Sequence, residues 1–400
     1  MTGKQNAPEI RFEGFTDPWE QRKLGDVSKK VTTKNTDGAL NETFTNSAER
    51  GIVSQLDYFD HDITNEANVN GYYVVLPNDF VYNPRISTIA PCGPINRNRL
   101  NRAGVMSPLY TVFSIDDGVC KTYLEHYFKT SRWHDFMFLE GNSGARSDRF
   151  SISDSLFFEM PIWCPSLAEQ EAIAQQLELT DNLITLHQRK YDKLCTVKKS
   201  MLDKMFPKPG ETEPEIRFEG FTDPWEQRKF SDLTDRVSIQ SSDSDLPQVE
   251  YEDIISGEGT LNKDLRDKEG GKTGIKFYAG DVLYGKLRPY LMNWLYPQFN
   301  GVAVGDFWVL RATECDSSFL YRLIQTDSFQ RLANISSGSK MPRADWNLIS
   351  QSFFAVPADH AEQRAIAKSL AELDNLITLH QRKLDLLKNM KKSLLDKMFV

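Results

Sequence analysis

The chain has 400 residues, of which 40% are hydrophobic and 26% charged, and its formal net charge is −8. This length favours two or more domains, and this composition is typical of a folded protein rather than a disordered one. No apolar run reaches the roughly 18 to 20 residues of a membrane helix, and the five scattered cysteines argue against a disulfide framework or a zinc ribbon. Because no apolar signal-peptide core follows the N-terminus, we expect a cytoplasmic protein.

The first recognisable feature is a segment that occurs twice. PEIRFEGFTDPWEQRK occupies residues 8–23 and again 214–229, and all 16 positions are identical. The segments DNLITLHQRK and KKSMLDKMF also return, the second as KKSLLDKMF, 193 residues further on (374 minus 181). A period near 200 residues is too long for a solenoid and indicates two half-molecules with approximate two-fold symmetry.

The first variable block, residues 24–160, is predicted to be a mixed α/β globule. A helical stretch is expected at 121–138, followed by a Gly/Ser loop with basic residues, GNSGARSDRFS, at 141–151. Alternating or apolar runs predict β-strands at 71–76, 79–83 and 107–115.

A long amphipathic helix is predicted to follow the first block, and its pattern returns at the end of the chain. Apolar residues alternate at spacings of four and three, which is an a/d heptad seam. One such helix cannot bury its stripe alone, so we expect the two helices to pair as an antiparallel coiled coil. The predicted seam contains Ile173, Leu177, Ile184, His187 and Leu194 in the first helix, and Ile366, Leu370, Ile377, His380 and Leu387 in the second.

His187 and His380 occupy matching seam positions. We interpret them as polar residues that set register and orientation rather than as metal ligands, and their direct pairing across a crossing point is a hypothesis. The two-fold arrangement also predicts that segment 8–23 lies near the end of the second helix and that segment 214–229 lies near the end of the first.

The second variable block, residues 230–356, is also predicted to be a mixed α/β globule. Strands are expected at 280–287 and 301–312, a helical stretch at 317–334, and a basic Gly/Ser loop, SSGSKMPRADW, at 337–346.

Both blocks contain loops rich in basic residues, and such loops are candidate contacts to DNA. Arg can pair with a guanine edge and Asn with an adenine edge, although phosphate contact or plain solvation is the commoner role of a single Arg. The candidates are Arg85, Asn96, Arg97, Asn98, Arg99, Arg102, Arg146 and Arg149 in the first block, and Lys272, Tyr284, Lys286, Arg288, Tyr290, Lys340 and Arg343 in the second.

No catalytic, nucleotide-binding or metal-binding motif is recognisable. The sequence EGGKTG at 269–274 contains the GKT of a P-loop, but Arg266 stands where the first glycine is required. The sequence lacks GxGxxG, HExxH, GxSxG and any clustered His/Cys set. These observations favour a protein that recognises another molecule rather than one that catalyses a reaction.

The layout resembles the specificity subunit of type I restriction-modification systems over essentially the whole chain. Two variable blocks alternate with two repeated helical segments, each entered through an AEQ..IA sequence and closed by a DKMF-like ending. The resemblance implies an α+β fold with two mixed α/β target recognition domains, two helices in an antiparallel coiled coil, and a circular pseudo-two-fold repeat. The expected parts are 1–23, an N-terminal segment; 24–160, the first recognition domain; 161–213, the first helix; 214–229, the repeated segment; 230–356, the second recognition domain; and 357–400, the second helix.

The resemblance also implies partners and cofactors. Each recognition domain would read one half of a bipartite site in double-stranded DNA, and the helices would fix the gap and dock two methyltransferase subunits. Two restriction subunits could join them. S-adenosylmethionine, ATP and Mg would be bound by those partners, while this chain would bind no cofactor or metal and carry no catalytic residue. Two alternatives stay open: an acidic anti-restriction protein that binds the methyltransferase, and a stand-alone DNA-modifying enzyme.

Overall fold

The computed structural model describes residues 7–59, 66–143, 148–265, 268, 270–335 and 341–400. The chain divides into two compact units. Unit 1 comprises Met1–Leu186 and Leu384–Val400, and unit 2 comprises His187–Lys383. Each unit therefore contains one variable block together with part of both long helices. The two helices are far apart in the sequence, so unit 1 is built from two separate stretches of the chain.

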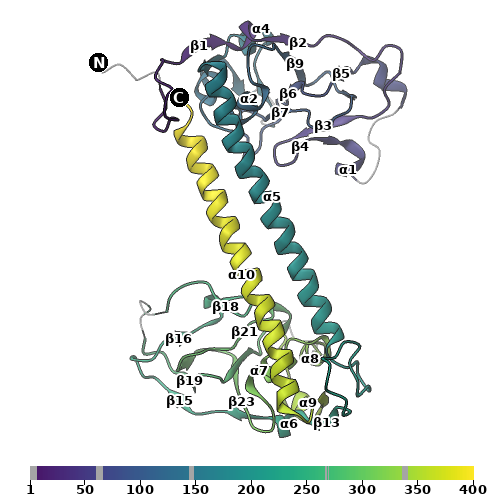
Figure 1. Ribbon diagram of the computed structural model, residues 1–400, viewed down its shortest axis with the longest axis vertical. Helices are drawn as coiled ribbons and strands as arrows, with labels where there is room; N and C mark the ends of the chain where they lie inside the picture. Colours follow the sequence, from purple (N-terminus) through teal and green to yellow (C-terminus); the bar gives the residue numbers. More distant parts are fainter. Residues whose placement is uncertain (1–6, 60–65, 144–147, 266–267, 269, 336–340) are drawn as a thin grey trace. The chain divides into compact units, whose positions relative to one another are not determined.

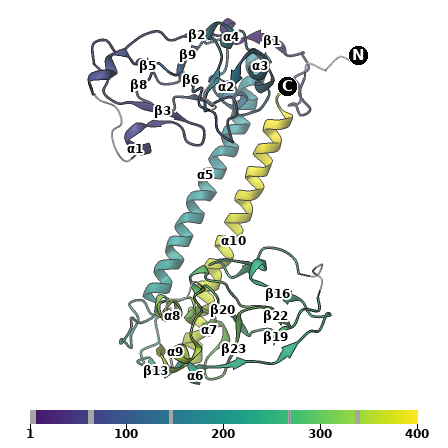
Figure 2. The ribbon, with the colours of Figure 1, turned by 180° about the vertical axis from the view of Figure 1, so that it is seen from behind.

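The two long helices are α5 (Leu167–Lys204) and α10 (His360–Lys397). Within each unit they run side by side in opposite directions (Figure 1), and Figure 2 shows the same pairing from behind. An ion pair joins Asp181 to Lys391 in unit 1, and its repeat counterpart joins Asp374 to Lys198 at 2.6 Å in unit 2. The predicted antiparallel pairing is confirmed.

Unit 1 contains an antiparallel sheet in the order β2 (Ser28–Lys30), β9 (Thr111–Ile115), β6 (Phe80–Tyr82) and β7 (Ile95–Arg97). Successive side chains of β6 point to opposite faces, so Phe80 and Tyr82 lie in one core and Val81 in another. The other elements are β1 (Glu20–Lys23), β3 (Phe44–Ser47), β4 (Gly51–Ser54), β5 (Tyr73–Val75), β8 (Gly104–Met106), β10 (Asn142–Ser143), β11 (Phe150–Ser151), β12 (Pro161–Cys164), α1 (Gln55–Phe59), α2 (Lys121–Tyr127), α3 (His134–Glu140) and α4 (Asp154–Phe158).

Unit 2 repeats this sheet in the order β14 (Thr234–Val237), β23 (Phe307–Ala312), β20 (Val282–Gly285) and β21 (Trp294–Leu295). Its strand β20 is likewise buried on both faces, with Tyr284 in one core and Leu283 in another. The other elements are β13 (Glu226–Lys229), β15 (Gln240–Ser241), β16 (Gln248–Val249), β17 (Ile254–Ile255), β18 (Thr260–Leu261), β19 (Gly274–Phe277), β22 (Gly301–Ala303), β24 (Phe353–Val356), α6 (Phe230–Leu233), α7 (Ser317–Leu323), α8 (Asp327–Ala333) and α9 (Trp346–Gln351).

The duplicated segments attach to the helix ends, as the sequence predicted. The Ile10 amide donates to the Lys397 carbonyl at 3.0 Å, and the Ile216 amide donates to the Lys204 carbonyl at 2.9 Å. These contacts confirm that segment 8–23 lies at the end of α10 and segment 214–229 at the end of α5.

Each predicted helical stretch of the variable blocks is broken into two short helices. The first gives α2 and α3, and the second gives α7 and α8. At the breaks, the hydroxyls of Thr130 and Thr326 donate to the carbonyls of Tyr127 and Leu323, each at 2.7 Å. A threonine side chain that bonds a nearby carbonyl competes with continued helical bonding, and this ends the first helix of each pair.

Candidate nucleic-acid interface

In each unit the loop that follows one central strand of the sheet, β6 in unit 1 and β20 in unit 2, is joined to a second loop by a pair of backbone hydrogen bonds. In unit 1 the Phe150 amide donates to the Pro84 carbonyl at 2.7 Å, and a second bond brings Arg85 opposite Arg149. In unit 2 the Ala344 amide donates to the Lys286 carbonyl at 2.9 Å, and the neighbouring bond places Leu287 opposite Arg343. Arg149 and Arg343 therefore occupy equivalent positions on the repeated scaffold.

The loop pair of unit 1 presents two exposed guanidinium groups. Arg85 and Arg149 are both exposed, and their side chains have no ion pair with another residue in the part of the chain that the structure describes. Arg146, a third candidate of this loop, lies outside the described residues. Two uncompensated cations on adjoining loops are available to phosphates or to base edges.

The loop pair of unit 2 is organised around one carboxylate. Asp306 accepts from Arg343 Nη2 at 2.9 Å and lies 3.5 Å from Lys286 Nζ. The Tyr251 hydroxyl donates to the Asp306 carbonyl at 2.6 Å and accepts from the Leu287 amide at 3.1 Å, which fixes the loop. Lys340 lies outside the described residues.

The next turn of unit 2 has an unusual backbone. Arg288 and Met292 flank the turn Pro289–Leu291 with φ angles of 50° and 53°, a left-handed conformation that non-glycine residues seldom adopt. Tyr290, Leu291 and Met292 are all exposed there. Sequence reasoning identified Arg288 and Tyr290 but missed Leu291 and Met292, since an apolar run gives no sign of its exposure.

The Arg/Asn cluster of unit 1 is engaged within the fold. Arg97 Nε and Arg99 Nη2 lie 2.8 Å and 2.7 Å from a Glu125 carboxylate oxygen, and Arg99 also reaches Glu178 of α5 at 3.0 Å. Burial would raise the pKa of Glu125, but the hydrogen bonds from Arg99 and the surrounding cations hold it below its usual range. Arg102 pairs with Glu42 at 2.7 Å.

The remaining candidates also have partners within the protein. Asn96 donates to Asn46 Oδ1 at 2.7 Å, and the buried Asn98 amide donates to the carbonyls of Leu76 and Arg102. Lys272 pairs with Glu250 at 2.7 Å. Tyr284 is fully buried between Trp308 and Phe329, so it offers no surface to DNA in this structure. The sequence could not show this, because an aromatic residue beside a lysine occurs both on surfaces and in cores.

The predicted helix seam differs along its length. Ile173, Leu177, Ile366 and Leu370 are buried in the unit cores, whereas Ile184, Leu194, Ile377 and Leu387 are half-buried. His187 Nδ1 and His380 Nδ1 lie 2.8 Å apart, which confirms the hypothesis that the two histidines pair directly.

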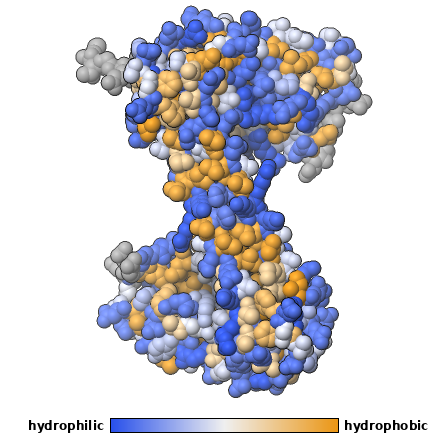
Figure 3. All heavy atoms as spheres, in the orientation of Figure 1, coloured by the Kyte–Doolittle hydropathy of each residue, from blue (hydrophilic) through white to orange (hydrophobic). Residues whose placement is uncertain are grey.

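A second stripe of apolar residues on the long helices is exposed. Leu183 and Leu186 of α5 are 44% and 47% exposed, and their repeat counterparts Leu376 and Leu379 of α10 are 44% and 46% exposed. Figure 3 shows apolar atoms gathered over the paired helices. The two units thus present the same apolar pair on the same scaffold.

Neither a metal site nor a membrane-spanning helix is found in the part of the chain that the structure describes. No group of three or more His, Cys, Asp or Glu side chains there could hold a metal ion. None of the described helices combines the length and apolar character needed to cross a membrane.

Two curated proteins that the chain resembles are both specificity subunits of type I restriction enzymes. The chain is 26% identical over 184 residues to the specificity subunit of the Escherichia coli type I restriction enzyme EcoDI, covering 44% of this chain and 41% of that protein. It is 22% identical over 268 residues to the specificity subunit of MjaVIII from Methanocaldococcus jannaschii, covering 61% and 62%. The chain therefore spans less than two thirds of the length of either curated relative, and no family model matches it.

A solved structure matches over nearly the full length. It is the S subunit of a type I restriction-modification system from M. genitalium, with a TM-score of 0.57, 13% identity, and coverage of 98% of this chain and 99% of that one. This match shows a shared fold.

Proposed function

We propose that this chain is the DNA-reading specificity subunit of a type I restriction-modification complex and is itself non-catalytic. The observation that carries the proposal is the duplication. Two units with the same sheet order each place an arginine, Arg149 or Arg343, at the same joined loop pair, and both units share one pair of antiparallel helices. A repeated scaffold with different loop chemistry suits a protein that reads two different half-sites.

The joined loops of each unit are the proposed reading elements. In unit 1 they supply Arg85 and Arg149, and in unit 2 they supply Lys286, Arg288, Tyr290 and Arg343. A side chain that forks onto a guanine edge distinguishes base pairs, whereas phosphate contacts only position the protein. Each half-site contact is weak by itself, and linking two units raises the affinity through effective concentration.

The long helices are proposed to fix the gap between half-sites and to dock two copies of a methyltransferase subunit. The identical exposed pairs Leu183 with Leu186 and Leu376 with Leu379 support the docking, because identical partners need identical surfaces. S-adenosylmethionine would be bound by those methyltransferase subunits, and ATP with Mg by restriction subunits where they join. The complex would work in the cytoplasm.

The proposal is tested by expressing the chain with the methyltransferase subunit encoded beside it in a methylation-free host and mapping modified adenines across the genome. We expect a split motif with a fixed gap. Exchanging residues 24–160 for the corresponding block of another such subunit should change one half of the motif only. Absence of modification by an assembled complex would overturn the proposal and favour an inhibitor.

A further inference from the structure

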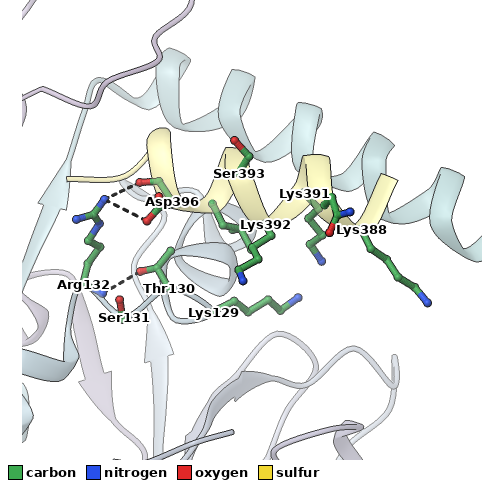
Figure 4. Close-up of a pocket in the computed structure, with 11 residues that line it drawn as sticks. Lys129, Thr130, Ser131, Arg132, Lys388, Lys391, Lys392, Ser393 and Asp396 are labelled. Carbon is green, nitrogen blue, oxygen red and sulfur yellow. Dashed lines mark hydrogen bonds and ion pairs between the residues drawn. The ribbon is translucent and has the colours of Figure 1, made fainter. Parts of the chain in front are cut away.

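A groove in unit 1 collects positive charge that the function described above does not use. It lies between the turn that joins α2 to α3 and the last turns of α10, with a volume of about 750 Å³. Figure 4 shows Lys388, Lys391 and Lys392 extending from α10 to the side on which Lys129 lies. With Arg132, five cations line the groove against the single carboxylate of Asp396, which gives a formal charge of +4 on a chain whose net charge is −8.

Three of the five cations have a carboxylate partner, among them Arg132, whose Nη2 lies 3.9 Å from Asp396 Oδ1, and the other two have none among the described residues. Lys391 pairs with Asp181, and Lys129 lies 3.6 Å from Glu125, a carboxylate that it shares with Arg97 and Arg99. Lys388 and Lys392 are exposed and make no ion pair with another described residue.

The cations of the groove also affect the pKa of the buried His126. Burial, and then the charges of Lys129 and Lys391, lower the pKa of His126 to about 2. Like charges held together in this way make binding of an anion favourable.

The repeat provides an internal comparison, because three of the five groove cations are replaced by other residues in unit 2, whereas Lys391 and Lys392 return as Lys198 and Lys199. Thr130 and Thr326 make the same hydrogen bond, which aligns Lys129 with Gln325 and Arg132 with Ser328. The helix repeat aligns Lys388 with Cys195. The scaffold therefore folds without these three cations, so their presence in unit 1 is not a requirement of the fold.

We propose that this groove binds the phosphate backbone of DNA beside the half-site that unit 1 reads. The inference rests on the proposed function. Lysine acts as a point charge for phosphate, and Ser131, Ser393 and Asn389 add neutral hydrogen-bonding groups. Leu395 is the one apolar side chain among the lining residues, all of them described, whereas protein interfaces depend on aromatic or apolar anchors. A polyanion therefore fits the groove better than a protein surface does.

The test compares Lys388→Gln/Lys392→Gln with Lys190→Gln/Lys193→Gln in the assembled methyltransferase complex. Both variants remove two exposed lysines from a long helix, the first inside the groove and the second on α5 in unit 2. Binding to a duplex of mixed sequence is measured across salt concentrations. We expect the slope of log association constant against log salt to fall by about 0.9 for each phosphate that the protein no longer neutralises, in the groove variant only.

The outcomes separate the two proposals. An equal slope change in both variants, or none in the groove variant while the wild type still methylates a split motif, would overturn the groove and leave the proposed function standing. Weaker assembly with the methyltransferase at an unchanged slope would assign the groove to a protein partner and also overturn it. A wild-type complex that neither binds nor methylates DNA would overturn both. Lys129→Gln, which introduces the residue of unit 2, provides an independent variant and should also lower the slope.

Discussion

His187 Nδ1 and His380 Nδ1 are 2.8 Å apart in the helix seam of unit 2, and the 193-residue repeat maps each histidine onto the other. A hydrogen bond between two such nitrogens requires one ring to donate and the other to accept. The two repeat-equivalent histidines therefore differ in protonation at Nδ1, which carries a proton in one ring and none in the other. The pair also sets the register, since one residue of slip would separate the two rings and break their hydrogen bond.

Replacing both rings, His187→Leu/His380→Leu, should stabilise the chain by roughly 1–2 kcal/mol at neutral pH, because it extends the apolar seam. Burial and then the neighbouring His187 lower the pKa of His380. The unfolded chain therefore binds protons more readily, and wild-type stability should fall as pH drops below about 6.5. Urea unfolding at several pH values should show this loss in the wild type and a flatter profile in the variant. Arg189→Leu/Arg382→Leu, which adds two exposed leucines at repeat-related positions, is the control and should keep the wild-type pH profile.

The buried carboxylate of Glu169 should depend strongly on Arg11. Arg11 donates two hydrogen bonds to it at 2.7 and 2.8 Å, and Trp19 Nε1 donates a third at 3.3 Å. Arg11→Ala leaves a carboxylate that is only 1% exposed without its cation, so we expect a loss of about 3 kcal/mol in urea unfolding. Arg22→Ala, on an exposed strand nearby, should change stability by less than about 0.5 kcal/mol. Equal effects of the two changes would contradict this interpretation of the pair.

The same arrangement occurs in unit 2, where Arg217 donates to Glu362 at 2.7 and 2.8 Å. Arg217→Ala should therefore cost about as much as Arg11→Ala. A large difference between the two losses would show that the repeated segments hold the helix ends with different strength.

Lengthening both helices should change the gap in the DNA motif and nothing else. Seven residues inserted beside His187 and seven beside His380 preserve the heptad register and add about 10 Å to each helix, which corresponds to about three base pairs. Genome-wide methylation mapping should recover the same two half-sites with a longer gap. The same insertion in one helix alone should abolish methylation, because it shifts the seam of that helix against its partner. An unchanged gap with both insertions would contradict the proposal that the helices fix the gap between the half-sites.

The equivalent arginines should act on different halves of the motif. Arg149→Gln should weaken discrimination at positions of one half-site by about 1–3 kcal/mol, and Arg343→Gln should do so in the other half. Binding to duplexes altered in one half-site at a time measures this. Arg331→Gln, an exposed arginine paired with Asp327 within α8, is the control and should leave both halves unchanged. A uniform loss over all duplexes would make Arg149 and Arg343 phosphate contacts instead of base-reading residues.

The repeat and the heptad spacing were enough to predict the scaffold. Identity between the repeated segments predicts equivalent environments, and the seam leaves each helix with an apolar stripe that the other helix can cover. The antiparallel pairing, the histidine contact and the attachment of segment 8–23 to the end of the second helix followed from this symmetry.

Only the tertiary structure decided which basic residues are available to contact DNA. Arg97 and Arg149 look alike in the sequence, yet Arg97 is held against a buried carboxylate and Arg149 is exposed. Tyr284 lies in a core, and the lysines of the groove come from segments more than 250 residues apart (388 minus 129). Periodicity records which face of an element is apolar, but the partner of a single charged side chain depends on contacts between distant segments, which only folding brings together.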